Sequence, residues 1–210
     1  MNDSTDLVHH HLTDWVGYEK LLDIITTHNL HHLEGDFVEI GTLFGGGARK
    51  LSTFLEKYVP HKLLYVIDIF DPNTDIMRNT DNYPMNELYT KTLSTLGFTS
   101  QWEVFQEVTQ DCKNIRVLKG DTKKMSLPPE KVAFAFIDAN HSPDHVLNDF
   151  HLVWEKLVPR GCIAFDDYRG DLPQVTETID HIISTLQEQL TGHAYPEGHI
   201  AYLLKKDPSE

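Results

Sequence analysis

The 210-residue sequence is short of cysteine and of basic side chains, and it has no apolar run long enough to cross a bilayer. Two cysteines, Cys112 and Cys162, do not make a disulfide framework, so we expect a reducing, cytoplasmic setting. Lys and Arg number 18 against 32 Asp and Glu, which gives a formal charge of -14. Because phosphate groups need basic contacts, this balance argues against nucleic acids and anionic membranes as partners. The polar start of the sequence has no signal-peptide pattern.

The remaining composition is typical of one globular domain. Hydrophobic residues make up 40% of the chain and charged residues 24%, and we find no repeat, low-complexity tract or linker. A chain of this length can bury a sizeable core. We therefore predict a single domain over 1–210, with a helical leader at 1–33, a core at 34–170, and a C-terminal helix and strand at 171–210.

Strand-like and helix-like patterns alternate along the chain. Short apolar runs predict strands at 36–40, 62–70, 114–119, 132–139, 161–165 and 199–205. Apolar residues at helical spacing predict helices at 15–29, 46–58, 85–96, 102–112, 143–157 and 172–190. The Val-Pro-Arg-Gly sequence at 158–161 is interpreted as a stop between helix and strand. Apolar strands that alternate with helices indicate an α/β fold whose parallel sheet is covered on both faces.

The first predicted strand ends in a glycine-rich turn that opens into a helix, with the sequence DFVEIGTLFGGG at 36–47. Such a turn binds nucleotide-like ligands, because glycine lets a ligand approach the backbone and the helix start offers free N–H groups. Glu39 precedes the first glycine of this turn. A carboxylate there suits a cationic or hydroxyl-bearing ligand better than a pyrophosphate, which favours an amino-acid-bearing nucleoside over a dinucleotide.

Acidic residues stand at the carboxyl ends of five predicted strands. They are Glu39, Asp68, Asp121, Asp138 and the pair Asp166 and Asp167. Acids are uncommon in strands, and right-handed crossovers bring the carboxyl ends of parallel strands to one edge of the sheet. We therefore expect these carboxylates to gather on one rim.

Together these segments resemble the class I S-adenosylmethionine-dependent methyltransferases. The resemblance lies in VEIGTLFGGG, VIDIFD, LKGDT, FIDANHSPDHVLNDF and GCIAFDDY, and it covers about 34–168. It implies a single Rossmann-like domain with a mostly parallel seven-stranded sheet in the order 3-2-1-4-5-7-6, the last strand antiparallel, and helices on both faces. The Asp-x-x-His sequence and the late Asp-Asp pair are similar to the metal-dependent small-molecule O-methyltransferases, which include the catechol, caffeoyl-CoA and macrolide-sugar enzymes.

The resemblance also implies which residues contact S-adenosylmethionine. Asp68 would accept hydrogen bonds from both ribose hydroxyls, and Glu39 would lie near the methionine moiety. Ile69 would flank the adenine, although a core role fits it nearly as well. Asp121 and Thr122 are either adenine contacts or a simple turn. The complete set comprises Glu39, Gly41, Thr42, Gly45, Asp68, Ile69, Asp121, Thr122 and Asp138.

A divalent cation is the second ligand that the resemblance implies, with Asp138, Asp166 and Asp167 around it. Neighbouring strands lie about 5 Å apart, so three bare carboxylates at their ends would raise one another's pKa values. A divalent cation removes that cost, and oxygen ligands favour Mg²⁺ first, then Mn²⁺ or Ca²⁺, over zinc. The alternative is that Asp166 caps a turn and Asp167 is solvated.

His141 lies three residues after Asp138, at an offset where the catechol and caffeoyl-CoA enzymes have Lys. Imidazole titrates near neutrality and can accept a substrate proton, so His141 and Asp138 are the catalytic candidates. A surface residue at a helix start is the alternative for His141. The implied mechanism is in-line transfer of the sulfonium methyl to a hydroxyl polarised by the cation, accelerated mainly by orientation.

The implied substrate is a small hydroxylated molecule, such as a catechol or other vicinal diol, a phenol or a sugar. Segment 71–89 is long for a connection and is a candidate lid. Its Tyr83, Met85 and Tyr89 either line a pocket or merely pack. A homodimer would fit the habit of the family.

Three other functions stay open. A dinucleotide-dependent oxidoreductase needs Gly-x-Gly-x-x-Gly, whereas this turn has its glycines at Gly41 and Gly45. A metal-independent methyltransferase would leave Asp166 and Asp167 incidental. A binding module could keep the fold without turnover.

Overall fold

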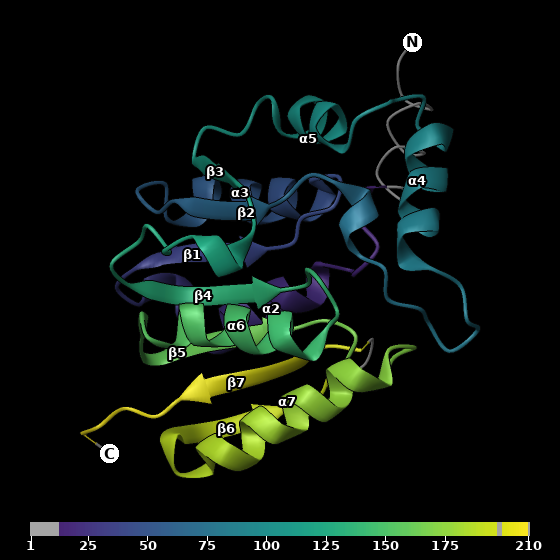
Figure 1. The fold of residues 1–210 in the computed structure, drawn as a ribbon. Coiled ribbons are helices and arrows are strands. Elements are labelled where there is room, and N and C mark those ends of the chain that lie inside the picture. The colour runs from purple at the N-terminus through teal and green to yellow at the C-terminus, as the bar shows by residue number, and fades with distance from the viewer. Residues whose placement is uncertain (1–12, 197–198, 210) are drawn as a thin grey trace.

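The structure, a computed structural model, describes residues 13–196 and 199–209. Its centre is a seven-stranded sheet in the order β3-β2-β1-β4-β5-β7-β6 (Figure 1). The strands are β1 (Asp36–Ile40), β2 (Leu64–Asp68), β3 (Ile115–Lys119), β4 (Val132–Ile137), β5 (Leu157–Phe165), β6 (Leu190–Ala194) and β7 (Ala201–Lys205). β1 to β5 pair in parallel, and β7 is antiparallel to both β5 and β6. The predicted fold class, strand order and antiparallel last strand are confirmed.

Helices cover both faces of the sheet. The described α-helices are α2 (Glu19–Thr27), α3 (Gly46–Tyr58), α4 (Met85–Thr95), α5 (Gln101–Thr109), α6 (Pro143–Trp154) and α7 (Pro173–Leu186). One core lies between the sheet and α2, α3 and α5, and a second lies between the sheet and α6 and α7. Successive strand residues enter opposite cores, as Phe37 and Val38 of β1 do. None of these helices is both long and apolar enough to cross a membrane.

The first part of the segment between β2 and β3, up to the end of α4, lies beyond the carboxyl ends of the strands (Figure 1). It holds a short 3-10 helix, η2 (Pro72–Thr74), and then α4, which packs through Leu93 and Leu96 against Phe44 of the glycine turn and Val104 of α5. This small third core fixes α4 beside the rim rather than on a face of the sheet. The segment after β2 is thereby placed next to the predicted site.

The predicted elements differ from the observed elements near both ends of the described chain. The opening helix was expected at 15–29 but begins at Glu19, because Gly17 has a φ of +75° and breaks the helical pattern. The helix expected at 172–190 ends at Leu186, and a short 3-10 helix, η4 (Gln187–Gln189), leads into β6, which the residue pattern did not predict. Residues 1–12 of the predicted leader lie outside the described part of the chain.

The Val-Pro-Arg-Gly sequence at 158–161 belongs to β5 and is not a stop before it. α6 ends at Trp154, earlier than predicted, and β5 begins at Leu157. Proline has no N–H to donate, and Arg160 has a φ of +64°, so the strand bulges here. The pairing register between β4 and β5 shifts at the same place.

Candidate active site

The carboxyl ends of β1, β2, β4 and β5 form one continuous rim. Backbone hydrogen bonds extend the ladder beyond the strands themselves. The backbone N–H of Gly41 donates to the carbonyl of Ile67 in β2 at 2.8 Å, that of Asp138 donates to β1 at 2.8 Å, and that of Asp166 donates to β4 at 3.2 Å. The glycine turn and the late acids therefore stand side by side, as the sequence predicted.

Gly41 is required by the backbone at this rim. Its φ is +84°, and a Cβ built on it would lie 1.9 Å from the carbonyl oxygen of Asp138. A side chain is excluded on both counts, because L-residues rarely adopt this φ and the neighbouring carbonyl is backbone that cannot move aside. The turn after β1 consequently packs directly on the end of β4.

Asp68 ends β2 and holds the glycine turn through its carboxylate. Its Oδ2 accepts from the backbone N–H groups of Thr42 (2.9 Å) and Leu43 (3.3 Å), and its Oδ1 accepts from that of Phe70 (2.6 Å). Burial raises the pKa of Asp68, and these hydrogen bonds offset part of the rise. Nε2 of Gln101 also lies 3.4 Å from both oxygens, so a ligand hydroxyl at Asp68 would have to replace this long contact.

Glu39 lies beneath the turn as a fully buried carboxyl group. The hydroxyl of Tyr18 donates to its Oε1 at 2.5 Å, and Oε2 meets no hydrogen-bond partner among the described residues. Tyr18 reaches it across the start of α3, where a Cβ on Gly47 would lie 1.8 Å from the Tyr18 ring. Burial raises the pKa of Glu39 to about 8, against the lowering effect of the Tyr18 hydrogen bond.

A cavity of about 620 Å³ lies over this rim. Of the predicted site residues, Gly41, Thr42, Asp68, Ile69, Asp121, Thr122, Asp138, His141, Asp166 and Asp167 line it. Glu39 and Gly45 do not: Glu39 is buried behind the turn, and Gly45 immediately precedes α3 with a φ of +86°. Phe70, next to Ile69, packs in the core against Trp102 and Phe105. Apart from Glu39, the predicted acids, which are widely separated in the sequence, thus share one cavity.

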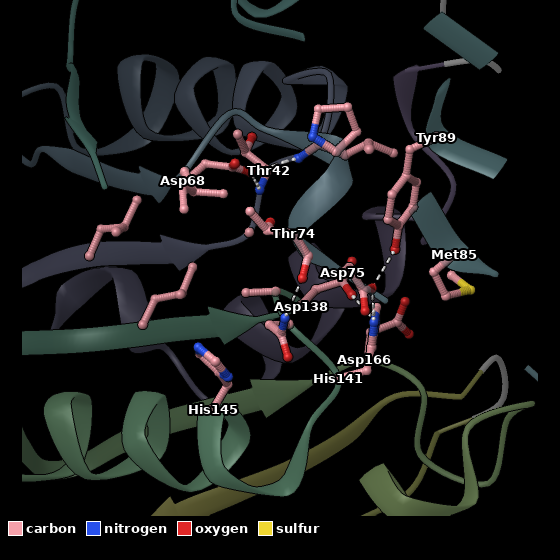
Figure 2. Close-up of a pocket in the computed structure, with 18 of the residues that line it drawn as sticks. Thr42, Asp68, Thr74, Asp75, Met85, Tyr89, Asp138, His141, His145 and Asp166 are labelled. Atoms are coloured by element: carbon pink, nitrogen blue, oxygen red, sulfur yellow. Dashed lines mark hydrogen bonds and ion pairs between the residues drawn. The ribbon is translucent and has the colours of Figure 1, made fainter. Parts of the chain in front are cut away.

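His141 is the centre of a cluster of carboxylates on one side of the cavity (Figure 2). Its Nδ1 lies 2.7 Å from Oδ2 of Asp75, and its Nε2 lies 2.8 Å from Oδ2 of Asp167 and 3.8 Å from Oδ1 of Asp138. The ring is buried, with 6% of the residue exposed, so it is not the surface residue of the alternative interpretation.

Each titratable group in this cluster has a pKa that is shifted by its neighbours in the cluster. Burial alone would lower the pKa of His141, but Asp138, Asp167 and Asp75 raise it well above the usual 6.5. The pKa values of Asp138 and Asp166 are both raised, first by burial and then by neighbouring carboxylates. The cluster therefore favours a cation at its centre.

Donor atoms of Asp138, His141 and Asp167 all lie within 4.8 Å of one another, close enough to hold a metal ion. Asp166 also lines the cavity, but it is outside this set of three. Asp167 is placed by a left-handed backbone conformation with a φ of +59°. Asp tolerates this conformation better than most residues, and such backbone strain is typical of functional sites.

Residues that the motifs did not identify complete the cavity. Asp75 comes from an acid-rich segment whose spacing gives no signal, and Trp15 and Tyr18 come from the leader. Of the three side chains left open in segment 71–89, Met85 and Tyr89 line the cavity and Tyr83 lies outside it. The unusual length of that segment was the signal that could have identified Asp75.

A family model for the methyltransferase domain matches residues 38–168, which is more than half of the chain. The chain therefore belongs to this family. Among curated proteins, an uncharacterised protein, R132, of Acanthamoeba polyphaga mimivirus is 34% identical over 61 residues. That match spans 28% of this chain and 28% of R132.

Solved structures show the same fold at low sequence identity. The O-methyltransferase NovP superposes with a TM-score of 0.72 and 17% identity, over 93% of this chain and 83% of NovP. The calicheamicin methyltransferase CalS11 gives 0.62 and 14%, over 99% of this chain and 88% of CalS11. MycE of the mycinamycin biosynthetic pathway, in complex with Mg, SAH and mycinamycin VI, gives 0.52 and 14%; 94% of this chain is covered but only 52% of MycE.

Fold and family together define the protein as a class I S-adenosylmethionine-dependent methyltransferase, an enzyme. The spacing of the glycine turn had argued against a dinucleotide-dependent oxidoreductase, and the family match agrees.

Proposed function

We propose that this methyltransferase is an O-methyltransferase that acts on a hydroxyl group of a small molecule with the help of a divalent cation. The observation that carries the proposal is the cluster of Asp138, Asp166, Asp167 and His141 on the wall of the cavity that the glycine turn also lines. A methyl donor held at the turn and a hydroxyl held at the cluster would face each other across one space.

The residues present fit both ligands. Asp68 would hold the ribose in place of its long contact with Gln101, and Asp121 and Thr122, which line the same cavity, would contact the adenine edge. Asp138 and Asp167, with Asp166 beside them, would hold the cation, because hard divalent ions such as Mg²⁺ take carboxylate oxygens. When bound, the cation would supply Lewis-acid polarisation of a hydroxyl and neutralise the carboxylates.

The chain's own contribution to the reaction would be orientation and proton transfer. Met85 and Tyr89 line the cavity beside the cluster and would orient the acceptor molecule. His141, in its neutral form, would take the hydroxyl proton at Nε2, the ring nitrogen on the side of Asp138 and Asp167; a cation held by those two carboxylates would favour that form by cancelling the charge that raises the pKa of the ring. A vicinal diol or catechol presents two oxygens to such a cluster, which makes these the favoured substrates.

A metal-independent methyltransferase is a second candidate, and one observation favours it. The pKa of His141 is raised by three carboxylates around it, so a protonated imidazole already places a positive charge in the cluster. In that case the histidine would balance Asp138 and Asp167, and no further cation would be needed.

The test is methyl transfer from labelled S-adenosylmethionine to catechol, caffeate and a methyl glycoside with vicinal hydroxyls, with Mg²⁺ or with EDTA. We expect transfer to at least one acceptor, lost in EDTA and restored by excess Mg²⁺. Transfer that EDTA leaves unchanged would select the metal-independent candidate. Transfer to none of these three hydroxylated acceptors would contradict the proposed function.

A further inference from the structure

Asp14 is a buried acid in segment 13–18, which lies against the start of α3 and precedes α2 in the sequence. Its side chain is 6% exposed and lines the cavity. Oδ2 forms an ion pair with Nζ of Lys50 in α3, whereas Oδ1 is shielded from solvent and meets no hydrogen-bond donor among the described residues. A buried oxygen without a donor costs free energy, so the position of Oδ1 calls for an explanation.

Two glycines hold segment 13–18 against the start of α3. A Cβ on Gly46 would lie 2.4 Å from the carbonyl oxygen of Thr13, and one on Gly47 would lie 1.8 Å from the ring of Tyr18. Any other residue at either position would therefore displace the segment. Asp14 is thereby fixed where the glycine turn passes into α3.

The ion pair with Lys50 explains only one of the two oxygens of Asp14. Lys50 also pairs with Oε1 of Glu19 at 2.5 Å, and that carboxylate stays at the surface, with 70% of its side chain exposed. An ion pair that anchors segment 13–18 to α3 thus does not require a buried acid. A shielded oxygen on the wall of a cavity is suited instead to a ligand that brings its own donor.

The methyl donor carries such a group at the matching end. Asp68 accepts from the backbone N–H groups of Thr42 and Leu43 at the start of the glycine turn, whereas segment 13–18 lies at the other end of the turn. A nucleoside whose ribose is held at Asp68 would direct its amino-acid part along the turn toward α3. The α-amino group of that part is an ammonium, which carboxylates bind through charge-assisted hydrogen bonds. Glu39 does not line the cavity and is not placed for this contact.

We propose that Asp14 binds the α-ammonium group of S-adenosylmethionine through Oδ1, while Oδ2 keeps its ion pair with Lys50. The inference goes beyond the proposed function, because it concerns the methyl donor and depends on neither the cation nor the acceptor. Asp14 lies outside residues 38–168, which the family model matches. Segment 13–18 would therefore add a charged contact to the cofactor that the family match does not include.

Calorimetry with two ligands tests this inference: S-adenosylhomocysteine and the analogue that lacks only its α-amino group. Both are titrated into wild type, Asp14→Asn and Glu19→Gln, in EDTA and without an acceptor. Asn keeps the size of the side chain but removes its charge. Glu19→Gln is the matched control, because it removes the other carboxylate that pairs with Lys50 and does not line the cavity.

We expect wild type to bind S-adenosylhomocysteine about 10- to 100-fold more tightly than the analogue, which is the worth of a hydrogen bond to a charged group. Asp14→Asn should reduce this preference about tenfold, whereas Glu19→Gln should keep it within about twofold of wild type. A change in the packing of segment 13–18 would weaken the binding of both ligands alike, so it cancels in the ratio of the two affinities.

A preference in Asp14→Asn as large as that of wild type would overturn the inference, and so would an equal loss of preference in Glu19→Gln. Wild type that binds both ligands equally would also overturn it, and that result needs no variant. The acceptor panel is independent of these titrations. An absence of methyl transfer there would contradict the proposed function and leave the result on Asp14 unchanged.

Discussion

Replacement of the buried Glu39 by Gln should make the stability of the protein less sensitive to pH. Folding raises the pKa of Glu39 from the ordinary 4.5 to about 8. Below pH 4.5 the group is protonated in both states and contributes nothing. Between pH 4.5 and 8 it ionises only when the chain unfolds, so the free energy of unfolding falls as the pH rises. Above 8 the loss is complete.

The size of this effect follows from the two pKa values. Each unit by which folding raises a pKa is worth about 1.4 kcal/mol, so the full penalty on wild type is on the order of 4 to 5 kcal/mol. Gln has a similar shape and can still accept from the Tyr18 hydroxyl, but it does not titrate. Relative to wild type, Glu39→Gln should therefore gain roughly 4 kcal/mol of stability between pH 5 and pH 8.

Urea denaturation of both proteins at several pH values measures this difference directly. Other titrating groups are common to both proteins and largely cancel in it. Glu130→Gln, which changes an exposed carboxylate, controls for the loss of one negative charge. A difference between Glu39→Gln and wild type that stays constant from pH 5 to pH 8 would show that Glu39 is ionised in the folded protein and would refute the reasoning.

Three further predictions concern the rim and the cysteines. Asp68→Ala should abolish binding of S-adenosylhomocysteine in calorimetry, whereas Asp166→Ala should bind it normally and lose methyl transfer; equal affinities would contradict this division. Gly41→Ala should lower the free energy of unfolding by more than about 3 kcal/mol in urea, because it adds a backbone clash to an unfavourable φ. Gly97→Ala, at a φ of +78° with open space, should cost only about 1 kcal/mol, and a similar cost for both would show that the clash relaxes. A thiol reagent should label the half-buried Cys112 in the native protein but not the other, buried cysteine; labelling of both without denaturant would contradict the described core.

Most strands of the central sheet could be predicted because the residues of each strand identify it without reference to its neighbours. β4 is wholly buried and is an unbroken apolar run, and β1 is buried from Phe37 onward and interrupted only by Glu39, so both strands could be predicted without tertiary information. β6 was not predictable in this way. Its residues, Leu-Thr-Gly-His-Ala, alternate between half-buried and exposed and gain their strand conformation from pairing with β7. The count of seven strands came from the family resemblance.

Residues of the site could be predicted where an acidic side chain stands at the carboxyl end of a strand. Asp68, Asp138 and Asp166 could be placed on one rim because parallel strands all end there. Asp75 could not, because it reaches His141 through the path of a long segment that no spacing rule describes. The resemblance gave His141 a role, but only the structure shows the carboxylates on both of its ring nitrogens.

The place of β7 in the sheet has a consequence for synthesis of the chain. β7 follows β6 in sequence yet lies between β5 and β6, pairing with both. When a ribosome has made residues up to 194, β5 and β6 have been synthesised but share no hydrogen bond. They are joined only once β7, residues 201–205, has also been made. During that interval β5, which is wholly buried from Gly161 onward in the finished protein, has an unpaired edge that another nascent chain could join. The time taken to translate residues 195–205 therefore affects how much of this enzyme is recovered without aggregation.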